Sequence, residues 1–175
     1  MKIEANILTE CFVDTLIVKT IMFPQKVCNH KKGCNDVLKQ MNDKFTNQAA
    51  FGIIDNDKVI RNFNDFSLLQ EQNEHLAIYK HNKKPHYVVK IGKAAEDFIL
   101  HCATQCSITL ADYDLPTDVT ELKKITKHFD SLEISESKLK KIFLDIKQNE
   151  NSDFCKLVQW IEMFKENPYN LDVKL

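Results

Sequence analysis

The sequence predicts an α/β fold with a mainly parallel sheet flanked by helices and a C-terminal helical extension. Short apolar runs alternate with amphipathic helical patterns along the first two-thirds of the chain, an order typical of parallel sheets. Residues 49–54 are apolar throughout, as expected of a strand buried on both faces. Three helical patterns follow residue 116. We therefore expect an α/β domain at 1–115 and a helical extension packed on it at 116–175.

The individual elements follow from residue spacing and from turn residues. The expected strands lie at 3–8, 26–29, 49–54, 76–79 and 87–91. The expected helices lie at 12–21, which Pro24 ends, and at 33–45, 94–106, 119–129, 136–146 and 153–164. Residues 60–73 carry no clear periodicity, and we expect a loop with a helical turn there.

Composition excludes several classes of protein. The 175 residues include 24 Lys+Arg and 25 Asp+Glu, so the formal net charge is −1. This balance argues against wholesale disorder and against a strongly basic nucleic-acid binder. The three glycines are isolated, which excludes a glycine-rich phosphate loop. The chain has neither a signal-like start nor an apolar run of roughly 18–20 residues, so we expect no membrane partner, a cytoplasmic location and reduced cysteines.

Two of the expected strands end in acidic residues. Glu10 follows the first strand, and Asp55 and Asp57 follow the buried central strand. Asp14 lies four residues after Glu10, in the first turn of the next helix. Because the carboxyl ends of parallel strands meet at one edge of the sheet, we expect these carboxylates to converge. Oxygen ligands of this kind suit Mg²⁺ or Mn²⁺, although acids after strands also serve as turn and N-cap residues.

The runs 7–14 (ILTECFVD) and 51–57 (FGIIDND) resemble a Toprim domain. That family has a glutamate after the first strand and an Asp-x-Asp after the third. The Glu-x-x-x-Asp spacing is closest to the OLD-type (overcoming lysogenization defect) nucleases, and Cys11 stands where topoisomerases have a glycine. Residues 94–100 (AAEDFIL) resemble the OLD-like helix that begins with an acidic residue. The resemblance extends over residues 3–106.

This resemblance implies a divalent-metal-dependent nuclease or phosphodiester-transfer protein. The metal ligands that it implies, for two Mg²⁺ (or Mn²⁺) ions, are Glu10, Asp14, Asp55, Asp57 and Glu96. Its catalytic residues would be Glu10, Asp55 and Asp57, with a lysine that meets the developing phosphate charge. Lys58, Lys90 and Lys93 are the candidates for that lysine. The first alternative is a non-catalytic Toprim-like interaction module that works with a partner ATPase.

A second alternative uses Asp55 differently. Residues 53–59 (IIDNDKV) also fit the opening motif of HAD-like phosphohydrolases, in which Asp55 is the nucleophile and Asp57 a general acid/base. That motif normally opens the chain, whereas here it lies about 50 residues in and lacks a convincing downstream G-D-x-x-x-D.

Two further patterns concern partners. Lysines and histidines gather at 30–32 and 80–93, which favours contacts with a nucleic-acid backbone. The apolar faces of the C-terminal helices, which include Trp160, predict packing on the sheet domain or a homodimer interface.

Overall fold

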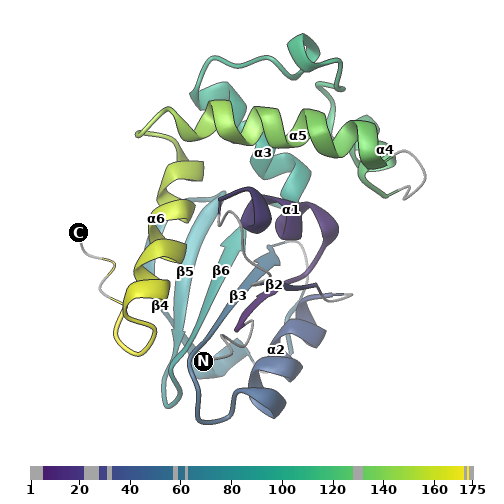
Figure 1. Cartoon of the computed structure of the whole chain (residues 1–175). Coiled ribbons are helices and arrows are strands. Elements are labelled where there is room, and N and C mark those ends of the chain that lie inside the picture. Colours follow the sequence, from purple (N-terminus) through teal and green to yellow (C-terminus); the bar gives the residue numbers. More distant parts are fainter. Residues whose placement is uncertain are drawn as a thin grey trace.

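The computed structural model describes residues 6–21, 28–30, 33–56, 59–61, 63–127, 132–171 and 173, with the main chain alone for 28–30 and 132–135. A six-stranded sheet in the order β2-β1-β3-β6-β5-β4 forms its centre (Figure 1). The strands are β1 (Ile7–Thr9), β2 (Cys28–His30), β3 (Ala50–Asp55), β4 (Phe66–Asn73), β5 (Leu76–His81) and β6 (His86–Ile91). The first four in sheet order are parallel, and β5 and β4 join antiparallel. The expected α/β class is therefore confirmed.

Among the described residues, six α-helices and two short 3₁₀ turns accompany the sheet. The α-helices are α1 (Phe12–Ile21), α2 (Cys34–Lys44), α3 (Ala95–Gln105), α4 (Val119–Lys127), α5 (Leu132–Lys147) and α6 (Asp153–Glu166). The 3₁₀ turns are η1 (Phe63–Asp65) and η2 (Leu110–Tyr113). Each helix lies close to its predicted place, because apolar residues recur at helical spacing in all six segments.

The loop expected over 60–73 is wrong for its second half. After η1 the chain forms the edge strand β4, which pairs with β5 through a register that shifts between Leu68 and Gln70 and again between Glu71 and Asn73. These irregularities break the alternation that marks a strand in sequence. The turn into β5 also lacks glycine, and the Asn73 side chain closes it by accepting a hydrogen bond from His75 N–H (2.8 Å).

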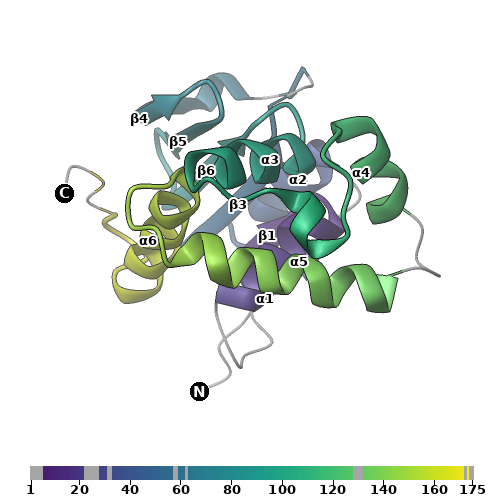
Figure 2. The same ribbon diagram turned by 90° about the horizontal axis from the view of Figure 1, so that it is seen from above.

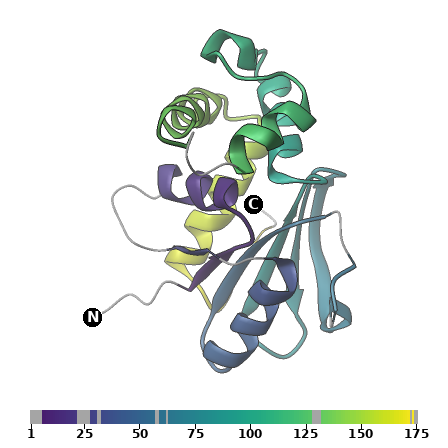
Figure 3. The same cartoon turned by 90° about the vertical axis from the view of Figure 1, so that its right-hand side faces the viewer.

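Helices pack on both faces of the sheet (Figure 3). On one face, residues of α1, α3, α5 and α6 join β3, β5 and β6 in the larger hydrophobic core, where the Phe51 and Phe164 rings lie 5.2 Å apart. On the other face α2 covers a smaller core. A Cβ at Gly52 would lie 3.0 Å from both Met41 Sδ and Val37 Cγ1, so glycine allows α2 to approach β3 closely.

Helices α4 and α5 lie over the end of the sheet toward which the parallel strands point, whereas α6 runs along one face of the sheet (Figures 1 and 2). Helix α5 contacts α1, α3, α4 and α6, and fully buried Phe143 and Trp160 join the same core as the sheet. The boundary between 1–115 and 116–175 stays a prediction. In the described part of the chain, no helix has the length and apolar character needed to cross a membrane.

Candidate acidic site at the carboxyl edge of the sheet

Glu10 and Asp55 lie side by side where two neighbouring parallel strands end. Strand β1 pairs with β3 up to Thr9 and Ile53, and Glu10 N–H continues the ladder by donating to Ile53 O (3.1 Å). The Glu10 carboxylate then accepts a hydrogen bond from Asp55 N–H (3.0 Å to Oε2). The two acids therefore meet at one edge of the sheet, as expected for the ends of two parallel strands.

Asp14 joins these acids from the first turn of α1. Its Oδ2 accepts a hydrogen bond from Cys11 N–H (3.1 Å), and Cys11 Sγ accepts one from Asp14 N–H (3.4 Å). This reciprocal pair has the pattern of a capping box, with Cys and Asp in place of the usual Ser and Glu. Asp14 is fully buried, and its second oxygen, Oδ1, has no hydrogen-bond partner in the described structure. Capping thus accounts for one of the two carboxylate oxygens.

Burial and like charges make this centre electrostatically costly. Burial raises the pKa of Asp14 well above its usual range, and the negative charges of Asp55 and Glu10 raise it further. Burial likewise raises the pKa of the Cys11 thiol well above its usual range, and Asp14 and Asp55 add to that shift. Two like charges about 4 Å apart repel by about 4 kcal/mol at an effective dielectric constant of 20. A proton or a cation would relieve this repulsion.

Glu96 occupies the first turn of α3, and α3 follows β6, the strand that pairs with β3. It is 7% exposed, and its carboxylate accepts a 2.5 Å hydrogen bond from Thr126 Oγ1 on α4. This bond ties α3 to α4. Two other predicted site residues, Asp57 and Lys58, lie outside the described residues. Among the residues that the structure does describe, no three His, Cys, Asp or Glu side chains are grouped closely enough to hold a metal ion as they stand.

The two remaining candidate lysines differ in position. Lys90 points to the α2 face of the sheet, where its ammonium lies 4.2 Å from the centre of the Phe63 ring and 5.2 Å from that of Tyr79. Burial there lowers the pKa of Lys90. Asp14 approaches from α1 on the other face, so Lys90 is turned away from it. Lys93 is exposed in the turn after β6, and its N–H donates to Asp97 Oδ2 (3.1 Å).

A histidine cluster that the sequence did not reveal lies along the same edge. The imidazoles of His75 and His101 stack with their centres 4.0 Å apart. His101 Nε2 lies 2.6 Å from buried Asp153 Oδ2, and His75 Nδ1 lies 3.4 Å from Asp97 Oδ2. These residues come from the β4–β5 turn, α3 and α6, which are remote in sequence. No local motif could have joined them.

The backbone links this cluster to the acids. Gly92, directly after β6, donates its N–H to His75 O (2.8 Å), and its carbonyl accepts from Asn56 N–H (3.1 Å). Because adjacent strands lie about 4.8 Å apart, the His75 backbone is about 10 Å from that of Asp55 along the edge. The cluster ties α3 and α6 to the sheet beside the acidic centre.

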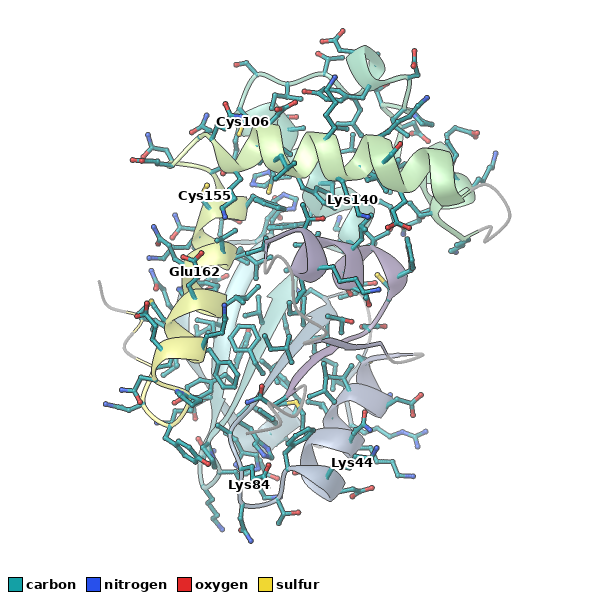
Figure 4. The ribbon with its side chains drawn as sticks, in the orientation of Figure 1. Lys44, Lys84, Cys106, Lys140, Cys155 and Glu162 are labelled. Carbon is teal, nitrogen blue, oxygen red and sulfur yellow. The ribbon has the colours of Figure 1, made fainter. Side chains whose placement is uncertain are left out.

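The sequence predicts that the cysteines are reduced, and the described cysteine side chains can be compared with that prediction. The structure places none of Cys11, Cys34, Cys102, Cys106 and Cys155 in a disulfide. The last two lie where the end of α3 meets the start of α6 (Figure 4). Cys106 Sγ contacts Ile146 O at 3.9 Å, and Cys155 Sγ contacts Lys147 O at 3.2 Å.

Comparison with protein-family models, with curated proteins and with solved structures finds no match.

Proposed function

We propose that this chain is a Toprim-like, divalent-metal-dependent nuclease or phosphodiester-transfer protein, closest to the OLD type. The observation that carries the proposal is the convergence of Glu10, Asp14 and Asp55 at the carboxyl edge of the sheet, with Asp14 Oδ1 buried and without a hydrogen-bond partner among the described residues. The placement of Glu10 directly after β1 and Asp55 at the end of β3 supports the resemblance.

The donor set fits Mg²⁺ or Mn²⁺, because both ions prefer carboxylate oxygens. Asp14 Oδ1 and the Asp55 carboxylate would bind the ion, while Glu10 holds the end of β3 in place through Asp55 N–H. A bound divalent ion supplies activation of water and stabilisation of the leaving oxygen of a phosphodiester. Asp57, two residues beyond Asp55, would complete the oxygen set, and Lys58 or Lys93 would meet the phosphate charge.

Plasmid nicking with Mg²⁺ or Mn²⁺ tests this function. We expect the wild type to nick supercoiled DNA and Asp55→Asn to lose activity by about a hundredfold or more. Asp43→Asn, which changes an exposed acid on α2, is the matched control and should retain full activity. A melting curve for each variant checks that it is folded. Equal nicking by Asp55→Asn and wild type would refute a role for this centre.

A non-catalytic interaction module is the second candidate. The observation that favours it is that Glu10 and Asp14 each bind backbone N–H groups, which is a structural use of a carboxylate. In that case neither Mg²⁺ nor Mn²⁺ would raise the melting temperature, and no nicking would occur. Hydrolysis of a small phosphomonoester without any nicking would instead favour the HAD-like use of Asp55.

A further inference from the structure

A cavity of about 300 Å³ lies at the opposite edge of the sheet from the acidic centre. It is bounded by α2, by the start of β4 and by the β5–β6 turn. The residues that line it are Leu38, Asn42, Asp65, Phe66, His81, Lys83 and Lys84. Its volume is at the lower end of the range for small-ligand sites.

The register of the strands sets the separation of this cavity from Asp55. Ala50 pairs with His86 at one end of the β3–β6 ladder, and Asp55 pairs with Ile91 at the other. Five steps of about 3.3 Å place the two edges about 17 Å apart. His81 ends β5 beside the start of β6, so it lies at the His86 edge. The cavity is therefore a second site, distinct from the acids.

His81 presents a fixed hydrogen-bond donor. Its Nδ1 accepts a hydrogen bond from Lys83 N–H (3.1 Å), so the neutral ring carries its proton on Nε2. Burial lowers the pKa of His81, Asp65 opposes that shift, and Lys84 and Lys83 lower the pKa further. The positive potential of the two lysines is thus felt at the ring, and the imidazole is neutral at pH 7.

Lys83 and Lys84 supply positive charge to the cavity. Lys84 Nζ donates to Asn42 Oδ1 (2.8 Å), which holds its ammonium against α2 and leaves two N–H donors. Lys83 is exposed, and Asp65 is the only acid that lines the cavity among the described residues. Two cations and a neutral N–H donor against one carboxylate give the cavity a net positive charge.

We propose that this cavity binds a phosphate group carried by a nucleotide or by a nucleic-acid backbone. The lysines and His81 Nε2–H would hold the phosphate oxygens, since ammonium and N–H groups are the donors that phosphates attract. The Phe66 ring, stacked on Phe63 at 5.1 Å, forms an apolar wall for the sugar or base. Asp65 would accept a hydrogen bond from a hydroxyl or a base N–H. The site binds whether or not the acidic centre is catalytic.

Fluorescence anisotropy with a labelled oligothymidylate of about 12 nucleotides, in EDTA, tests the proposal. Lys83→Glu and Lys84→Gln should each weaken binding, Lys83→Glu by about tenfold, and each lost lysine should lower the slope of log K against log salt by about 0.7. The matched control is Lys44→Glu, an exposed lysine of α2 at the same end of the molecule as Lys84 (Figure 4) but outside the cavity. It should change the affinity by less than about twofold.

Competition separates the two sources of phosphate. Complete displacement of the oligonucleotide by thymidine monophosphate indicates a nucleotide or chain-end site, and no displacement indicates a backbone site. In either case Asp65→Asn should tighten binding of inorganic pyrophosphate, because it removes the one carboxylate from the cavity. The proposal is overturned if wild type binds none of these probes, or if Lys83→Glu and Lys44→Glu weaken binding equally.

Discussion

The two edges of the sheet differ in charge, in burial and in what covers them. At the carboxyl edge, Asp14 is fully buried in the first turn of α1, and this helix contacts α3 and α5. At the amino edge, Lys83 is exposed in the β5–β6 turn beside a cavity, and buried His86 binds Phe45 O at the end of α2. The same parallel strands thus begin beside lysines and histidines and end beside acids.

This difference changes the meaning of the near-neutral composition. A formal charge of −1 over 175 residues argues against a basic nucleic-acid binder. In the fold, however, charges of opposite sign lie about 17 Å apart at the ends of β6. If the acidic centre binds a cation, as we propose, the remaining charged residues have a mildly basic balance. Overall charge is therefore a poor guide to what either edge binds.

The largest expected effect is a difference in the free energy of unfolding, because side chains at the two edges are packed to different degrees. Phe143 on α5 is fully buried against Phe154 (ring centres 5.6 Å apart), whereas Phe66 at the cavity is only partly buried. Phe143→Ala should lower the free energy of unfolding by about 3–5 kcal/mol and Phe66→Ala by about 1 kcal/mol. Urea unfolding measures both. Equal losses would show that the helix-covered edge is no better packed than the open one.

Divalent metal should stabilise one edge and leave the other unchanged. A single Mg²⁺ or Mn²⁺ site at a concentration 100-fold above its Kd adds about 2.7 kcal/mol to the free energy of unfolding. We expect thermal melts to show this gain in the wild type and in Lys84→Gln, and to show none in Asp14→Asn. A gain that survives in Asp14→Asn would place the metal elsewhere.

When metal is absent, the stability that each edge contributes to the fold should change with pH in opposite directions. The pKa of Asp14 is raised in the folded state, so its protonation stabilises the fold at low pH, and this stability is lost as pH rises from about 4 through the folded pKa. The pKa values of His81 and His86 are lowered, chiefly by burial, so these residues favour the fold above about pH 6.5 and destabilise it as pH falls.

Asp14→Asn isolates the acidic edge. It removes the buried charge but keeps an oxygen that can accept from Cys11 N–H. At pH 8 in EDTA we expect it to raise the free energy of unfolding, because burial and the neighbouring acids raise the pKa of Asp14 and so disfavour its charged form in the fold. At low pH the gain should vanish. Urea titrations at several pH values measure this, and a gain independent of pH would mean that folding does not shift the pKa of Asp14.

Much of the fold could be predicted because its signals are local. Helix α1 carries apolar residues at helical spacing, and β3 is apolar over almost its whole length. The meeting of Glu10 and Asp55 could also be predicted, because parallel strands end at one edge whatever their order. Strand β4 could not, because its register shifts hide the alternation of its side chains.

The rest of the two sites depends on tertiary contacts. The Cys11–Asp14 cap replaces the usual Ser and Glu, so the capping signature is absent from the sequence. His75, His101 and Asp153 come from three separate elements, and only packing brings them together. The cavity at the amino edge likewise needs α2 against β4, which no sequence spacing reports.

The smallest expected effect tests the charge of the amino edge directly. The Lys84 ammonium lowers the pKa of both His81 and His86, as a secondary contribution beside burial. Lys84→Met keeps most of the side-chain volume and removes the charge, so both pKa values should rise, and the rise should be small because solvent screens the ammonium. Histidine ring resonances followed by NMR over pH measure the change. Lys44→Met, at the same end of the molecule, should shift neither pKa, because Lys84 lowers the pKa of both histidines and Lys44 is not among the charges that shift them. A shift of the same size in Lys44→Met would mean that the positive potential is spread over the whole edge. The cavity would then attract a phosphate no more strongly than the surface around it.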